Sequence, residues 1–334
     1  SNADYISSNE RFKASLGIRT DASSYSSNTN KLYKQISPRL SLSYRLINNL
    51  NASINVGRYF QLPPLTALGF KNNEGVYMNK ELNYIEVNQL SGGFNYTFRD
   101  NIEISIEGFY KNYDKMPLSV EEGIPLMSKG DDYGVVGNEH LNSSSEGTSY
   151  GVELLARWIL IHKLNVSSSF TLFKSQFKNK NHKSVASAWD NGYIFNLSGT
   201  YYLPKNWSIG AKIKSIGGAP YTPYDVDKSS LVSTWDASGK PYLDYSQYNV
   251  KRSSSYTQLD LRIDKTFFIK KFMIGLYFDI QNATKSSLKN PDVILSTGKI
   301  INPEAPISEQ RYEMKTLKRS SSTMIPTIGV TFEL

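Results

Sequence analysis

Apolar side chains recur at every second residue in segment after segment of this chain of 334 residues. Ile102, Ile104 and Ile106, for example, alternate with polar neighbours. Apolar residues in a helix would recur every three or four positions, whereas a spacing of two places them on one face of a β-strand. We therefore expect an all-β chain of about twelve strands, one for each segment with this spacing. The segments are residues 12–18, 40–46, 50–56, 90–98, 102–110, 150–158, 164–172, 193–201, 207–213, 259–263, 272–280 and 328–334.

The connections between these segments alternate in length. Short turns at residues 47–49, 99–101, 161–163, 203–206 and 269–271 alternate with long polar stretches at 61–82, 114–146, 178–190, 219–253 and 283–320. Short periplasmic turns and long extracellular loops are typical of antiparallel barrels in bacterial outer membranes. A soluble sandwich would rarely hold loops of this length. The pattern predicts an antiparallel transmembrane β-barrel whose apolar face contacts lipid.

Composition agrees with a barrel and excludes several other classes. No run of about 18 apolar residues is present, so a transmembrane helix is not expected, whereas a barrel strand needs only about 10 alternating residues. The formal charge is +8, but the basic residues lie mostly in loops and turns, so we expect no nucleic acid as a partner. A solvated surface is the favoured interpretation of these residues, and a basic rim facing lipid phosphates is the alternative. The chain has no cysteine, which excludes disulfides and thiolate metal sites.

The alternate positions of the predicted strands are polar and point to the lumen in a barrel. A charged side chain facing lipid near the bilayer midplane would cost about 2–4 kcal/mol, so a wide, hydrated lumen is expected. For Asp260, Arg262 and Asp264 we favour pairing with neighbouring wall residues over pairing with a plug or solute. The charged residues predicted to face the lumen are Arg45, Glu103, Glu107, Glu153, Arg157, Asp260, Arg262, Asp264 and Asp279.

No constellation of catalytic or metal-ligating residues is evident. The three histidines, His140, His162 and His182, fall in separate connections, so neither a His-based catalytic site nor a zinc site is predicted. A solvated loop is favoured over a Ca²⁺ site for the acidic pairs 121–122 and 131–132. We expect a protein that is not an enzyme and needs no cofactor.

Aromatic residues gather in two kinds of place. Those beside the short turns, such as Trp158 and Trp207, predict a girdle at the lipid–water interface. Those in the long loops could stack on flat solutes or sugars, and packing of the loops on one another is an equally weighted alternative. The candidate solute contacts are Tyr133, Trp189, Tyr221, Tyr224, Trp235, Tyr242 and Tyr245.

Five segments together resemble the C-terminal half of TonB-dependent receptor barrels, in the form common in Bacteroidetes. They are residues 57–65, 147–153, 201–207 with 217–223, 252–265 with 280–282, and 325–334. Their order, and their placement at strand ends, carry the resemblance, which extends over most of the chain from about residue 37. The last residue departs from the commonest outer-membrane signal, because Leu334 takes the place of a terminal aromatic residue.

The resemblance implies a barrel of 22 strands in the bacterial outer membrane, enclosing an N-terminal plug and contacting TonB. This chain would be the C-terminal part of the wall, with the plug and the TonB-contacting region absent from it. Residues 1–3 look like a cloning scar, and residues 4–334 would form the barrel segment. The implied function is active uptake of a large scarce solute such as a siderophore, cobalamin, glycan or peptide. The implied partners are that solute, TonB, outer-membrane lipid and lipopolysaccharide. A passive porin-like channel and an adhesive or structural barrel are the alternatives.

Overall fold

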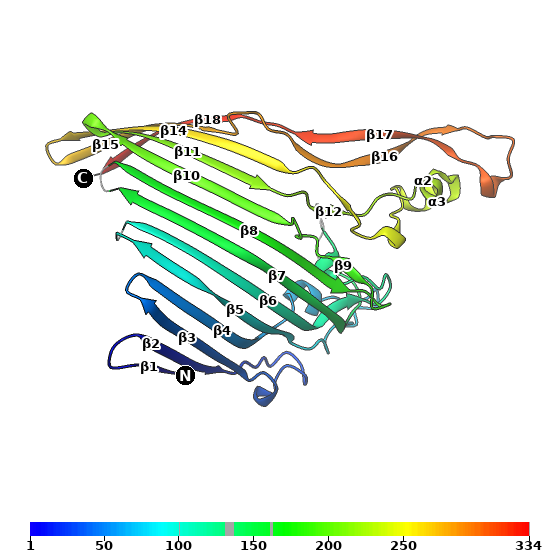
Figure 1. The fold of residues 1–334 in the computed structure, drawn as a ribbon. Helices are drawn as coiled ribbons and strands as arrows, with labels where there is room; N and C mark the ends of the chain where they lie inside the picture. Colours follow the sequence, from blue (N-terminus) through cyan, green and yellow to red (C-terminus); the bar gives the residue numbers. More distant parts are fainter. Residues whose placement is uncertain (100, 131–136, 161–162, 334) are drawn as a thin grey trace.

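The computed structural model describes residues 1–99, 101–130, 137–160 and 163–333. One antiparallel sheet of 14 strands dominates it, with neighbours along the chain lying side by side (Figure 1). The strands of its main path are β1 (Asn2–Ile6), β2 (Phe12–Arg19), β3 (Ser37–Ile47), β4 (Leu50–Gln61), β5 (Ile85–Phe98), β6 (Ile102–Ser119), β7 (Leu141–Leu160), β8 (Leu164–Lys178), β10 (Tyr193–Leu203), β11 (Trp207–Ile216), β14 (Tyr256–Ile269), β15 (Phe272–Gln281) and β18 (Ile325–Glu333).

The predicted all-β, antiparallel architecture is confirmed. Each predicted segment lies within a strand of this sheet, apart from Leu334, which is outside the described residues. The structure adds β1, which includes Asn2 and Ala3, and the short β9 (Ser184–Ala186), which pairs with the end of β8. The sheet is open, with β1 at one edge and β18 at the other (Figure 1).

The two ends of the sheet differ as the sequence predicts. Short turns join the strands at one end, and the long connections collect at the other (Figure 1). The short helices lie in these connections. They are η1 (Leu32–Lys34), α1 (Leu65–Leu68), η2 (Leu126–Ser128), α2 (Val226–Ser230), α3 (Val232–Ser238), η4 (Tyr245–Gln247) and η5 (Ile307–Glu309), with η3 (Pro204–Asn206) in a short turn. Within the described part of the chain, no helix is long and apolar enough to cross a bilayer.

Two of the predicted long loops contain more strand than the sequence suggested. Strand β6 continues to Ser119 and β7 begins at Leu141, which shortens the connection expected over residues 114–146. The stretch 283–320 contains a long hairpin of β16 (Leu288–Ile300) and β17 (Tyr312–Ser321), which forms a separate two-stranded sheet. A hairpin that covers no core needs no apolar face, so its sequence carries little of the period-two signal.

The pairing register places like residues in rows across the sheet. Thr97, Glu103 and Arg157 are successive register partners on one face. On the other face, Phe94 is 52% exposed and Leu172 is 55% exposed. A soluble monomer rarely exposes so continuous an apolar surface, whereas a barrel wall presents it to lipid.

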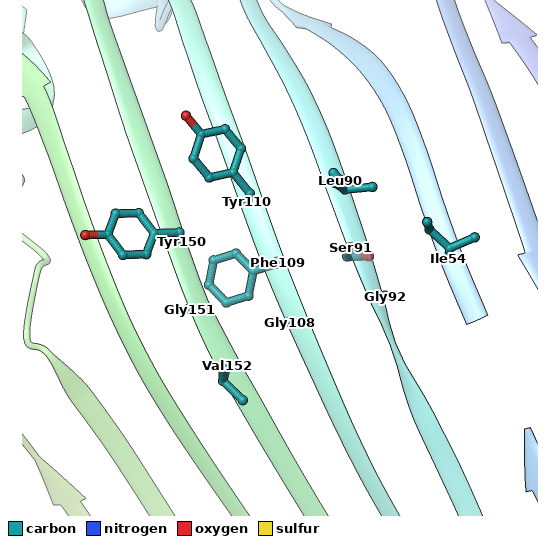
Figure 2. Close-up of a pocket in the computed structure, with 10 residues that line it drawn as sticks. All are labelled: Ile54, Leu90, Ser91, Gly92, Gly108, Phe109, Tyr110, Tyr150, Gly151 and Val152. Carbon is teal, nitrogen blue, oxygen red and sulfur yellow. The ribbon is translucent and has the colours of Figure 1, made fainter. Parts of the chain in front are cut away.

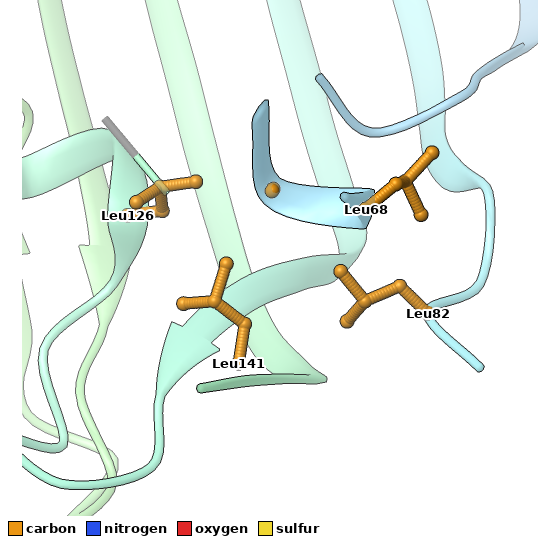
Figure 3. Packing of buried hydrophobic residues seen from close by; sticks show 5 residues of the cluster. Leu68, Leu82, Leu126 and Leu141 are labelled. Atoms are coloured by element: carbon orange, nitrogen blue, oxygen red, sulfur yellow. The ribbon is translucent and has the colours of Figure 1, made fainter. Parts of the chain in front are cut away.

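The buried apolar cluster lies at the long-loop end rather than between the strands. Leu68 of α1 packs with Leu82, Leu126 and Leu141 (Figure 3), and Ala67 completes the cluster. These residues come from two connections that are far apart in sequence and from the first residue of β7. Their burial removes apolar surface from water and so stabilises the loops against one another.

Candidate functional site

The charged residues predicted to face the lumen lie on the face opposite the apolar rows. Glu103 pairs with Arg157 across β6 and β7, with 3.4 Å between Oε2 and Nη1. The side-chain amide of Asn95 on β5 donates to Glu103 Oε1 at 2.9 Å. Glu107 is the register partner of Glu153, so two carboxylates oppose each other further along the same strands. This face therefore carries charges of both signs. Arg45 lies on the same face, as the register partner of Asn51.

Most of the charges on β14 are satisfied by their own neighbourhood. Arg262 binds both carboxylate oxygens of Asp264 and stacks its guanidinium 4.1 Å from the ring centroid of Tyr277. Asp260 accepts hydrogen bonds from the Gln258 side chain at 2.7 Å and from a backbone N–H at 2.9 Å. Asp279 on β15 is the register partner of Arg262. These contacts join β14 to β15 and to the residue that follows it.

Three long connections are joined at the residues that follow η4. The side-chain amide of Asn249 donates to the carbonyl of Ser128 at 2.6 Å and to that of Ala186 at 2.8 Å. One side chain therefore links the connections over residues 120–140, 179–192 and 217–255. Asn249 has φ 54°, a left-handed conformation that asparagine tolerates better than most residues.

A buried ion pair joins two of the same connections, and together with the hydrogen bonds of Asn249 it forms what we call the clamp. Arg252 Nη2 lies 2.5 Å from Asp190 Oδ2, and the side chain of Asp190 is 1% exposed. The other carboxylate oxygen of Asp190 accepts a hydrogen bond from the backbone N–H of Ser175 at 3.1 Å. A buried carboxylate needs such partners, because an unpaired one would carry a large desolvation cost.

Three tyrosines at intervals of three residues form a ladder beside the clamp. Ring centroids are 5.9 Å apart between Tyr242 and Tyr245, and 5.9 Å apart between Tyr245 and Tyr248. The hydroxyl of Tyr245 donates to Glu122 Oε1 at 2.8 Å. Burial, and then the bond to Glu122, raise the pKa of Tyr245, while burial and the nearby Glu122 charge raise the pKa of Tyr248. Lys129 binds Glu122 and Glu139, which ties the ladder to the neighbouring connection.

Some of the aromatic residues proposed from the sequence as solute contacts come together, and others do not. Tyr242 and Tyr245 belong to the ladder, and Tyr221 of β12 (Pro220–Tyr221) and Tyr224 lie in the same connection. Within that connection, β12 pairs with β13 (Lys251–Arg252), and Tyr224 bridges to Leu243. Trp235 is half-buried on α3, further along.

Trp189 lies outside the connection that holds the ladder, and three important residues were not singled out from the sequence. Trp189, in the neighbouring connection, is 57% exposed. Tyr133 lies outside the described residues. Tyr248, Asn249 and Arg252 were missed, and the only local signal was the three-residue spacing of the tyrosines.

The acidic pairs considered as a Ca²⁺ site are only partly described. Glu122 is occupied by Lys129 and Tyr245, while residues 131–132 lie outside the described part of the chain. Among the described residues, no three histidine or acidic side chains converge as metal ligands would.

The open antiparallel sheet, its apolar outer face, its polar inner face and its unequal connections define an outer-membrane β-barrel wall. Comparison with known families then makes the assignment specific. The chain belongs to the family described as TonB dependent receptor-like, beta-barrel, which it matches over residues 3–283. This family comprises outer-membrane receptors, not enzymes, and the predicted location in the bacterial outer membrane is confirmed.

Solved structures of low sequence identity share the fold. The chain is similar to FpvA of P. aeruginosa bound to a heterologous pyoverdine–Fe complex, with a TM-score of 0.59, 11% identity, and coverage of 86% of this chain and 34% of that one. It is similar to BauA, the ferric preacinetobactin receptor of Acinetobacter baumannii, with a TM-score of 0.59, 12% identity, and coverage of 99% and 42%. It is also similar to the FrpB iron transporter of Neisseria meningitidis, with a TM-score of 0.57, 12% identity, and coverage of 98% and 44%.

The chain thus spans less than half of the length of each of these structures. No curated protein matches its sequence.

Proposed function

We propose that this chain is part of the wall of a receptor that actively imports a large, scarce solute across the outer membrane. Family membership over residues 3–283 carries the proposal. The clamped outer connections support it, because a preorganised surface loses less entropy when it binds. Residues 4–334 would form one barrel segment of a 22-stranded wall, with residues 1–3 left from cloning.

The solute would first meet the aromatic residues of the outer connections. Tyr242 and Tyr245 lie in the ladder, and Trp189 is exposed in the next connection. Aromatic rings bury much area on a flat ligand or a sugar at low entropic cost. A ferric siderophore is one suitable class, because solved relatives are named for ferric complexes. Cobalamin, a glycan and a peptide fit the same chemistry.

The charged inner face would serve passage through the wall. Glu103, Arg157 and the Asp264–Arg262 pair lie on the face opposite the lipid-facing rows. We propose that a plug elsewhere in the protein contacts this face, and that TonB supplies energy through that region. A hydrated surface of mixed charge lets a polar solute move without a deep binding site.

An uptake assay with cells that make the full-length protein tests this function. Radiolabelled probes would be a ferric siderophore, cobalamin, an oligosaccharide and an oligopeptide, each supplied at nanomolar concentration to cells with and without TonB. Accumulation of one probe only when TonB is present is expected. Accumulation that persists without TonB, or single-channel conductance of the protein in a planar bilayer, would favour the passive channel instead. Binding of a partner cell or protein with no accumulation of any probe would favour the adhesive barrel.

A further inference from the structure

The lipid-facing surface has a groove where two glycines lie side by side on neighbouring strands. Ile54, Gly92, Gly108 and Val152 are successive register partners on β4, β5, β6 and β7. The middle two members of this row therefore carry no side chain. Figure 2 shows the glycines between the side chains of Ile54 and Val152. The groove has a volume of about 640 Å³, far more than the roughly 30 Å³ that one water occupies in the liquid.

The space above Gly108 is open, whereas a Cβ atom on Gly92 would lie 3.1 Å from the carbonyl oxygen of Ser53. A Cβ atom on Gly108 would find its nearest neighbour, the carbonyl oxygen of Gly92, 4.0 Å away. Leu90, Tyr110 and Tyr150 rim the groove on one side (Figure 2). The strand register places this side nearer the long connections. In a bilayer such a void is filled by lipid, because an empty one would forfeit the dispersion contacts of its walls.

The groove lies just below the outer edge of the apolar band. Leu90, Tyr110, Tyr150 and Lys174 are successive register partners in the row above it. Both tyrosines are half exposed, as rings at a lipid–water interface are expected to be. The next row toward the long connections is fully polar. It consists of Arg58, Asn88, Asn112, Thr148 and Gln176.

The belt above the groove, from β4 to β8, carries one more cation than anion. Arg58 and Lys115 share the carboxylate of Glu86, with N–O separations of 3.2 Å and 2.9 Å. Lys178 pairs with Glu146 at 2.7 Å. Lys174, beside Tyr150, has no ion pair in the described chain. The charged groups of this belt are Arg58, Lys115, Lys174 and Lys178 against Glu86, Asp114 and Glu146.

We infer that this surface is a binding site for one phosphorylated glycolipid of the outer leaflet, that is, for lipopolysaccharide. One acyl chain lies over Gly92 and Gly108, between Ile54 and Val152. A headgroup phosphate lies at Lys174, on the strand next to Tyr150. The site faces the outer leaflet because the long connections of such barrels are extracellular. It does not depend on the uptake function, since it uses only the lipid-facing side of the wall.

Retention of lipid by purified protein tests the site. The full-length protein would be extracted from outer membranes in mild detergent, and bound lipid would be counted by native mass spectrometry. Gly108→Leu fills the groove, and Lys174→Gln removes the free cation. Gly199→Leu is the matched control, because Gly199 lies on the same face as the partner of Val166 and a Cβ there meets only ordinary contacts at 3.6 Å and beyond. Folding of each variant would be checked by heat-modifiable electrophoretic mobility.

Wild-type protein and Gly199→Leu are expected to retain one phosphorylated glycolipid, and Gly108→Leu to retain at least about fivefold less, since the variant side chain takes the place of the acyl chain. After exchange, Lys174→Gln is expected to lose its preference for phosphorylated over dephosphorylated glycolipid. If Gly108→Leu fails to fold, Gly108→Ala provides the test, and a fall of about half is expected.

Three results would overturn the inference. Equal retention by wild type and the groove-filled variant would show that the groove holds no specific lipid. If the wild-type protein retained a zwitterionic phospholipid as well as it retains the phosphorylated glycolipid, the cations would have no role in binding. Loss of a cross-linkable dimer in Gly108→Leu, with glycolipid retention unchanged, would make a second copy of the chain the occupant.

Discussion

The contact between Arg252 and Asp190 shows how much one residue can contribute to the outer connections. Asp190 is almost fully buried, and Arg252 is the cation that reaches its carboxylate. Removing one partner of such a pair leaves a buried charge without compensation. Because Arg252 is itself partly exposed, the expected cost is about 1–3 kcal/mol rather than the larger value of a fully buried pair.

We predict that Arg252→Ala increases hydrogen exchange in residues 179–192 and 217–255, while the strands below keep their protection. Arg19→Ala is the control, since Arg19 pairs with Asp21 at an exposed site where an ion pair contributes little. Hydrogen exchange of the two variants in detergent, read by mass spectrometry, checks this. Unchanged exchange in Arg252→Ala would show that the pair does not hold the connections together.

Two glycines on neighbouring strands should respond very differently to the same substitution. A Cβ on Gly93 would meet the carbonyl oxygen of Ile106 at 2.0 Å, whereas one on Gly108 has no atom closer than 4.0 Å. Gly93→Ala must therefore shift the backbone of β5 or β6, and a destabilisation of about 1–3 kcal/mol is expected. Gly108→Ala should be nearly neutral. The unfolding temperatures of the two variants in detergent check this prediction, and equal temperatures would contradict the geometry.

Among the elements, the hairpin of β16 and β17 stands apart from the wall. Its tip contacts the helical connection, where Arg311 donates to Ser230 Oγ at 2.7 Å and Tyr312 donates to Asp236 at 3.1 Å. Strands β15 and β18 pair with each other directly, without help from the hairpin. The wall should therefore assemble in its absence.

We predict that replacing residues 288–321 with a short glycine-serine linker leaves outer-membrane assembly intact and exposes α2 and α3 to protease. Heat-modifiable mobility measures assembly, and limited proteolysis of intact cells measures exposure. The substitution Tyr312→Phe is the mild control, since it removes one hydrogen bond and keeps the hairpin. Loss of assembly in the deletion would mean that the hairpin is needed to close the wall.

The tyrosine ladder predicts that the stability of the outer connections depends on pH. The pKa of Tyr245 is raised in the folded protein, so the folded state holds its proton more tightly than the unfolded chain does. The resulting stability is complete below the ordinary tyrosine pKa of about 10 and is lost as the pH rises above it. Proteolysis of residues 217–255 should accelerate above pH 10, and less so in Tyr245→Phe. An identical acceleration in both proteins would exclude a role for this hydroxyl.

At the scale of the whole molecule, the chain is a curved wall with one apolar face and two strand edges. Ile328 on β18 is 79% exposed, and Phe94 in the middle of the sheet is more than half exposed. Surfaces of this kind associate in water, as do unpaired strand edges.

We predict that the 334-residue chain is monodisperse only with detergent or lipid and aggregates when these are removed. Static light scattering during detergent dilution checks this, with refolding into lipid vesicles as the control. A cooperatively folding monomer in plain buffer would mean that the apolar rows pack against each other rather than against lipid.

The sequence by itself determined the strands, the separation of an apolar from a polar face, and the unequal connections. A period of two is a local property, so a single segment such as residues 102–110 reports which of its side chains share a face. The resemblance to receptor barrels also came from short local segments, and the family match confirms it. The hairpin of β16 and β17 was not predicted, because no buried face imposes a period of two on its residues.

Only the tertiary structure decided which residues that are distant in sequence become neighbours. Asn249 donates hydrogen bonds to carbonyl groups more than 60 residues away in sequence. Arg252 pairs with Asp190, which lies 62 positions earlier in the chain. Gly92 and Gly108 become neighbours through the register of β5 against β6, which places one empty site next to another. Such contacts follow from the pairing of whole strands and the packing of whole connections, and local periodicity does not encode either of them.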